Sequence, residues 1–77
     1  MNIQNKDFED RIRIKLNGNF LSCSANMSIC NLIDYLDFQA NRIILEYNSK
    51  VLSSDMFVET VIKEGDNIEI VTIVGGG

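Results

Sequence analysis

The sequence predicts an α+β fold in which one main helix packs across one face of a mixed sheet of about four or five strands. Three observations support this prediction. An Asn-Gly pair at residues 17–18 separates two strand-like segments, a single stretch at residues 28–38 has helical periodicity, and residues 67–73 form a final apolar segment. Because strands precede and follow the helix, we expect the helix to cover the apolar face of one sheet.

The first predicted element is a β-hairpin. Aliphatic and cationic side chains alternate over residues 11–16, which places the aliphatic ones on one face of the sheet and the cations on the other. Asn17 and Gly18 tolerate the positive φ angles that a two-residue type I′ turn requires at both of its central positions. The chain is therefore expected to return as a second strand over residues 20–24.

The helix is predicted from about Ile29 to Phe38. Ser28 precedes it and is a good N-cap residue, because its hydroxyl can accept a hydrogen bond from a free N–H of the first turn. Four apolar residues recur at the spacing of one helical face: Ile29, Leu32, Ile33 and Leu36. This apolar stripe is expected to pack on the hairpin.

The rest of the chain predicts further strands around a short crossover. Residues 43–47 are typical of a strand, and a turn leads to a short strand at residues 51–52. Residues 53–62 favour a short helical turn that places Phe57 in the core. A Gly-Asp turn then precedes the last strand over residues 67–73, which is apolar on both faces and is therefore expected to be central in the sheet.

Composition excludes several classes of function. The 77 residues form one small domain with little room for an internal active site. A net charge of −4 argues against nucleic acid as a partner, and the absence of histidine excludes histidine-based metal sites and general bases. No apolar run approaches the roughly 18 residues of a membrane-spanning helix, and residues 1–10 lack the apolar core of a signal peptide.

The two cysteines, Cys23 and Cys30, are too few for the disulfide scaffold of a small secreted domain. We interpret them as reduced thiols at the edge of the core. The alternative is a pair that relays a persulfide sulfur.

Four segments together resemble a known family. In chain order they are "IRIKLNG", "SICNLIDYL", "IILEYNSKVL" and "FVETVIKEGDNIEIVTIVGGG". Their order and spacing make the chain, from Ile12 to Gly77, similar to the ThiS sulfur carriers of thiamine biosynthesis, which have the ubiquitin-like, or β-grasp, fold and are related to MoaD. The chain differs in carrying extra residues at its N-terminus and in having Phe57 where the family commonly has Trp.

This resemblance and the sequence pattern divide the chain into three parts. We expect a flexible N-terminal arm over residues 1–10, a β-grasp domain over residues 11–74 and a flexible glycine tail over residues 75–77. The domain would fold and dock, and the tail would reach into a partner.

The resemblance also implies a function as a carrier and not as an enzyme. The reactive group would be the α-carboxylate of Gly77. An E1-like, ThiF-like adenylating enzyme would use ATP to convert it to an acyl-adenylate, and a persulfide donor would then leave a thiocarboxylate. A ThiG-like thiazole synthase would accept the sulfur. The carrier itself would bind no cofactor and no metal, and would work in the cytoplasm or the plastid stroma without a nucleic-acid or membrane partner.

The residue types at the C-terminus suit this chemistry. Gly75, Gly76 and Gly77 have no Cβ, so they can thread a narrow channel and bring backbone atoms close to catalytic groups. Fixing three residues costs about 3–6 kcal/mol of backbone entropy. We therefore expect Val74 and exposed apolar side chains on the sheet to supply a compensating interface.

Three alternatives share this fold. A MoaD-like carrier would use the same chemistry for molybdopterin synthesis. A ubiquitin-like modifier would join its terminal glycine to lysines of other proteins. A plain β-grasp interaction module would make no use of the glycines.

Overall fold

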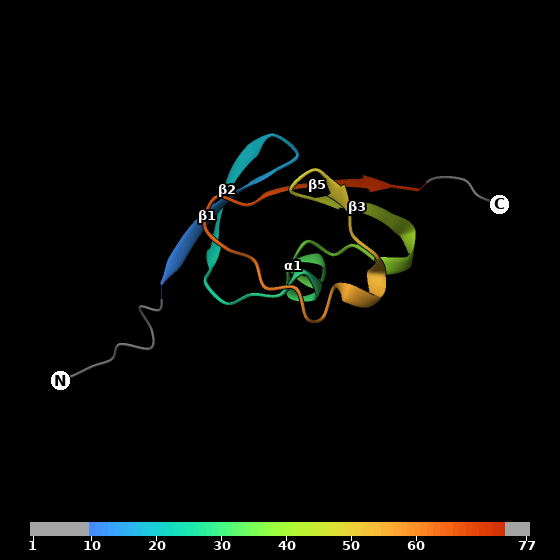
Figure 1. Cartoon of the computed structure of the whole chain (residues 1–77), viewed down its shortest axis with the longest axis horizontal. Helices are drawn as coiled ribbons and strands as arrows, with labels where there is room; N and C mark the ends of the chain where they lie inside the picture. The colour runs from blue at the N-terminus through green and yellow to red at the C-terminus, as the bar shows by residue number, and fades with distance from the viewer. Residues whose placement is uncertain (1–9, 74–77) are drawn as a thin grey trace.

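The computed structural model of the chain describes residues 10–73. Over this range the five strands form one sheet in the order β2-β1-β5-β3-β4, in which β1 and β5 are parallel and the other neighbours are antiparallel. Helix α1 lies against one face of the sheet (Figure 1). The elements in chain order are β1 (Arg11–Leu16), β2 (Asn19–Ser24), α1 (Ile29–Tyr35), the 3-10 helix η2 (Ala40–Arg42), β3 (Ile43–Tyr47), β4 (Lys50–Val51), the 3-10 helix η3 (Ser54–Met56) and β5 (Asn67–Thr72). The predicted α+β roll and the central position of its last strand are confirmed.

The β1–β2 hairpin has the turn that the sequence predicts. Asn17 and Gly18 have φ angles of 50° and 85°, and Leu16 pairs with Asn19 across the two-residue turn. Asn17 also connects the hairpin to β5: its side-chain Oδ1 accepts a hydrogen bond of 2.8 Å from the backbone N–H of Ile70. The turn residue therefore fixes both the hairpin register and the neighbouring central strand.

Helix α1 begins where predicted. Ser28 Oγ accepts a hydrogen bond of 3.0 Å from the Asn31 N–H, and Asn31 Oδ1 accepts one of 3.2 Å from the Ser28 N–H. This reciprocal pair is a capping box. Two further N–H groups of the first turn donate to backbone oxygens of the crossover after η3, Ile29 to Thr60 and Cys30 to Phe57.

Helix α1 ends at Tyr35, and the predicted end at Phe38 is wrong. Asp37 has a φ of 67°, a left-handed conformation that stops the helix. The N–H of Phe38 donates to the carbonyl of Ile33, and the N–H of Asp37 donates to that of Asp34, each at 3.0 Å. These are the two hydrogen bonds of a Schellman motif, with Asp in the position that glycine usually occupies.

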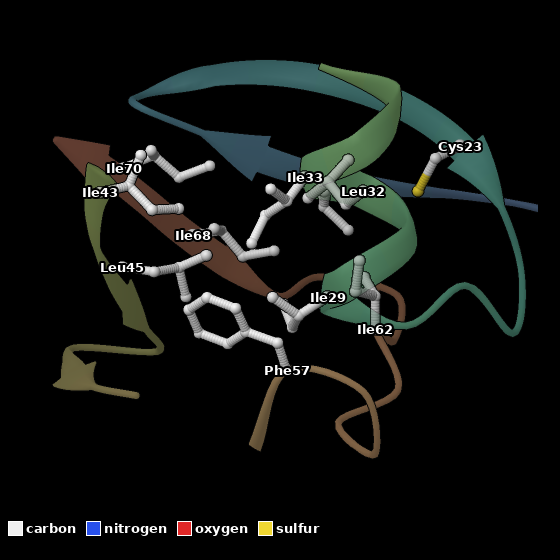
Figure 2. Close-up of a cluster of buried hydrophobic side chains, with 11 residues drawn as sticks. Cys23, Ile29, Leu32, Ile33, Ile43, Leu45, Phe57, Ile62, Ile68 and Ile70 are labelled. Carbon is white, nitrogen blue, oxygen red and sulfur yellow. The ribbon is translucent and has the colours of Figure 1, made fainter. Parts of the chain in front are cut away.

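The core lies between α1 and the sheet (Figure 2), where apolar side chains of both layers point toward one another. Phe57 and Ile62 come from the segment after β4 and complete the cluster, as the sequence predicts for Phe57. Among residues 10–73 no polar or charged side chain is fully buried. Fully burying one aliphatic side chain contributes about 1.5–3 kcal/mol. The buried residues are Ile14, Cys23, Ile29, Leu32, Ile33, Ile43, Leu45, Phe57, Ile62, Ile68 and Ile70.

Two further details differ from the sequence predictions. Strand β4 is Lys50–Val51 instead of residues 51–52, because Asn48 and Ser49 alone form the turn, with φ angles of 53° and 76°. Strand β5 is central, but its outer face is exposed, so apolar residues on both faces of a strand do not here mean that both faces are covered. The proposed arm lies outside the described residues except for Asp10, whose carbonyl accepts a hydrogen bond from the Ala25 N–H.

Candidate functional site at the end of β5

The site residues predicted from the sequence are Val74, Gly75, Gly76 and Gly77, and all four lie outside the described residues. The structure describes the end of β5 and Ile73, which directly precede these four residues, and we call this segment the base of the tail. Strand β5 pairs with β3 as far as Thr72, and the next residue, Ile73, donates its N–H to the carbonyl of Arg42 at 2.8 Å. The backbone is therefore held by the sheet up to Ile73, the last described residue.

The start of β5 is fixed by the Asp66 carboxylate. This group accepts hydrogen bonds from the Tyr47 hydroxyl at 2.5 Å, the Lys63 N–H at 2.8 Å and the Asn48 side-chain amide at 3.2 Å. Burial, the hydrogen bond to Asp66 and the negative charge of Asp66 raise the pKa of Tyr47 to about 12. Asp66 has a structural role here, in agreement with the prediction of a plain turn.

Three apolar side chains lie beside the base of the tail on the outer face of the sheet, and we call them the apolar strip: Ile44, Val71 and Ile73. Leu45 and Ile70 point into the core, so the alternation of strand side chains turns their neighbours outward. Ile44 pairs directly with Val71. The exposed fractions of Ile44, Val71 and Ile73 are 47%, 62% and 48%.

Exposed apolar side chains that adjoin one another are typical of interaction sites. The sequence predicts such side chains on the sheet but does not identify them. The three consecutive aliphatic residues at 43–45 contain the signal, because in a strand the middle one must face away from the core. The apolar strip is therefore the part of the candidate site that the structure adds.

Charged residues lie next to the apolar strip. Glu46 and Glu69 pair across β3 and β5 and are both exposed. A shallow hollow beside the base of the tail is lined by Asp37, Phe38, Gln39, Arg42, Ile43, Thr72 and Ile73. A partner that covers the apolar strip would thus meet both an acidic pair and the hollow that contains Arg42.

Cys23 does not suit the alternative role in sulfur relay. Both cysteines are free thiols, Cys23 on β2 and Cys30 on α1. Burial raises the pKa of Cys23, an effect that the nearby charge of Arg11 only partly opposes. A raised pKa keeps sulfur in its unreactive thiol form. The structure therefore favours the interpretation of Cys23 as a packing residue, and Figure 2 shows it at the edge of the core.

The described part of the chain has neither a metal-binding cluster nor a membrane-spanning helix. Within residues 10–73, no three His, Cys, Asp or Glu side chains are grouped as metal ligands would be. No helix in the same range is both long enough and apolar enough to span a membrane.

Comparison with known proteins gives a consistent result. A model of the ThiS family matches residues 14–77. The uncharacterized protein ycf40 of Porphyra purpurea is 46% identical over 86% of this chain and 93% of its own length. The sulfur carrier protein ThiS of Escherichia coli is 21% identical over 86% of this chain and its whole length.

A solved structure and a longer relative extend the comparison. The crystal structure of the thiamine biosynthesis protein ThiS from Geobacter metallireducens superposes with a TM-score of 0.75 and 28% identity, over 86% of this chain and all of that one. The thiazole synthase of Paramagnetospirillum magneticum is 26% identical over 86% of this chain, but the match spans 20% of that protein. A segment similar to nearly all of this domain thus forms part of a longer thiazole synthase chain.

Proposed function

Because the chain belongs to the ThiS family of small sulfur carriers of thiamine biosynthesis, we propose that it carries sulfur as a thiocarboxylate on Gly77 for thiazole formation. The observation that carries this proposal is the extent of the family match, which includes residues 74–77 and so includes the whole glycine tail. The β-grasp domain would present the tail, and the chemistry would take place in partner enzymes.

The proposed reaction activates an otherwise unreactive carboxylate. The Gly77 carboxylate attacks ATP in an adenylating enzyme, which forms an acyl-adenylate and releases pyrophosphate. The terminal sulfur of a persulfide then attacks the acyl carbon and AMP leaves. A second thiol cleaves the resulting S–S bond and is itself oxidised to a disulfide, which leaves the thiocarboxylate on Gly77. ATP is thus a substrate of the activating enzyme and not a cofactor of this chain.

The apolar strip is proposed as the docking surface that compensates for ordering the tail. Fixing Gly75, Gly76 and Gly77 costs about 3–6 kcal/mol. Burying three half-exposed aliphatic side chains in an interface contributes about 2–4 kcal/mol of favourable binding free energy. The apolar strip therefore offsets much of this cost, and Val74 and contacts along the tail must supply the remainder.

Thiazole synthase is the proposed acceptor of the sulfur. In the relative from Paramagnetospirillum magneticum, a segment like this chain lies within a chain named thiazole synthase. Covalent linkage keeps two modules at a high effective concentration, which is useful when they act in sequence. This match favours the thiamine pathway over the MoaD-like alternative. A ThiF-like adenylating enzyme and a persulfide donor complete the proposed set of partners.

The plastid stroma is the proposed compartment. The ycf40 relatives come from the algae Porphyra purpurea, Pyropia yezoensis and Trieres chinensis. Their origin in plastid genomes supports a plastid location for this chain.

The proposal is tested by the intact mass of the protein after incubation with an adenylating enzyme, ATP, a persulfide donor and a reducing thiol. We expect a mass gain that corresponds to the replacement of one oxygen by sulfur. A variant that lacks Gly77 should fold equally well by circular dichroism and show no mass gain. An unchanged wild-type mass would contradict the proposal, and ATP-dependent conjugates with other proteins would favour the ubiquitin-like modifier instead.

A further inference from the structure

The other half of the outer sheet face has a different character from the apolar strip. Arg11, Arg13 and Lys15 alternate along β1, and all three side chains are exposed on the face opposite α1. We call them the cationic strip. They are three of the seven lysines and arginines in a chain whose net charge is −4. Positive charge is therefore concentrated on one strand of an otherwise acidic protein.

The side chains of β2 hold the cationic strip in place. The Phe20 ring centroid lies 4.7 Å from Arg13 Cζ and 5.5 Å from Lys15 Nζ, both within the range of cation–π interactions. Arg11 donates hydrogen bonds to Ser22 Oγ at 3.3 Å and to the Ser22 carbonyl at 3.1 Å. The cations are thus partly ordered before any partner arrives, which lowers the entropy cost of binding.

No carboxylate faces the cationic strip from β2, one of the two strands that pair with β1, and on the other strand, β5, Asn67 is opposite Lys15. The residues opposite Arg11, Arg13 and Lys15 are Ser24, Ser22 and Phe20. The Oε1 atom of Glu64 accepts a hydrogen bond of 2.9 Å from the backbone N–H of Arg13. A hollow between these groups is lined by Arg13, Ile14, Lys15, Phe20, Glu64, Gly65 and Asn67.

We propose that the cationic strip and Phe20 form a docking surface for an acidic segment of a partner protein that binds in an extended conformation. Alternate residues of an extended chain lie about 6.5 Å apart, so carboxylates at every second position match the spacing of the three cations. Phe20 is 66% exposed and offers an apolar contact between them. Aromatic and arginine side chains together are typical of protein interfaces.

Protein fits this surface better than nucleic acid. Three cations neutralise few phosphates, and the rest of the chain carries a net negative charge that repels a polyanion. A short acidic peptide meets the cationic strip without passing over the Glu46–Glu69 pair on the other half of the face. This proposal does not depend on sulfur transfer, because it concerns residues that are separate from the tail and from the apolar strip.

The test is an NMR titration of the ¹⁵N-labelled full chain with the peptide Val-Glu-Val-Glu-Val-Glu-Val, blocked at both ends. We expect shifts of the amides of β1 and β2 that diminish as salt is added. The variant Arg11→Gln/Arg13→Gln/Lys15→Gln should bind roughly tenfold more weakly, since each exposed ion pair contributes modestly. The matched control Arg42→Gln/Lys50→Gln/Lys63→Gln removes the same charge elsewhere and should bind like the wild type.

Several results would overturn the proposal. One is equal weakening by the matched control, because it would show a general effect of net charge. Tighter binding of an oligothymidylate than of the peptide would favour nucleic acid. Shifts of β1 and β2 that depend on protein concentration without peptide would favour a second copy of the chain. If the triple variant does not fold, Arg13→Gln alone should still weaken binding measurably, and unchanged binding would contradict the proposal.

Discussion

The two faces of the sheet use the same kinds of side chain for different purposes. On the inner face of β5, Ile68 is completely buried beneath α1, whereas Val71 on the outer face of the same strand is 62% exposed. The inner face provides the burial that folds a small domain. The outer face contributes little to folding, so its aliphatic residues are free to serve binding. Hydrophobicity along a strand therefore identifies two faces and does not by itself tell which one is the core.

The largest expected difference between the two faces is in stability. Ile68→Ala should lower the free energy of unfolding by about 2–5 kcal/mol, because it removes buried methyl groups and leaves a cavity. Val71→Ala on the same strand should change it by no more than about 0.5 kcal/mol. Urea denaturation of both variants measures the contrast. Similar losses for the two would show that the outer face is covered in the folded protein.

The next effect concerns docking. Ile44→Ala should weaken binding to the cognate adenylating enzyme roughly tenfold, because well-packed apolar anchors contribute 1 kcal/mol or more to interfaces. The free energy of unfolding of the Ile44→Ala variant should differ little from that of the wild type. Val58→Ala is the matched control, since Val58 is also exposed but lies outside the apolar strip. Calorimetric titration measures both affinities, and equal affinities for the two variants would remove the apolar strip from the proposed interface.

The smallest effect is expected at the start of β5, where the Tyr47 hydroxyl donates a hydrogen bond to Asp66. Tyr47→Phe removes the hydrogen bond to Asp66 and should cost about 1 kcal/mol near neutral pH. The pKa of Tyr47 is raised to about 12 in the folded state, so the folded protein retains a proton that the unfolded chain loses above about pH 10. The stability of the wild type should therefore fall more steeply than that of the variant between about pH 10 and 12. Parallel curves over this interval would contradict the assigned role of Tyr47.

Much of the fold could be predicted because the turn, capping and periodicity patterns in the sequence agree with the way the elements pack together. The Asn17-Gly18 turn, the Ser28 N-cap and the central last strand are all confirmed. The helix end differs from the prediction because the apolar stripe extends to Leu36, whereas Asp37 adopts a left-handed conformation that the sequence favours only weakly. The one-residue error in β4 has a similar cause, since Ser49 is an uncommon residue at positive φ.

The candidate site was predictable in part. The glycine tail is visible in the sequence, and the family match includes it. The apolar strip depends on which residues of β3 and β5 are opposite one another, and that register follows from the packing of Leu45 and Ile70 in the core. Local periodicity does not tell which residues of two distant segments pair. Only the folded structure therefore shows that Ile44 and Val71 are neighbours.

The central claim is that sulfur travels on the C-terminal carboxylate and not on a cysteine. Fragmentation mass spectrometry of the sulfur-loaded protein tests this directly, because it locates the added sulfur along the chain. The account predicts that the mass change maps to Gly77 and persists in Cys23→Ala and Cys30→Ala. A mass change that maps to either cysteine, or that disappears with its substitution, would contradict it.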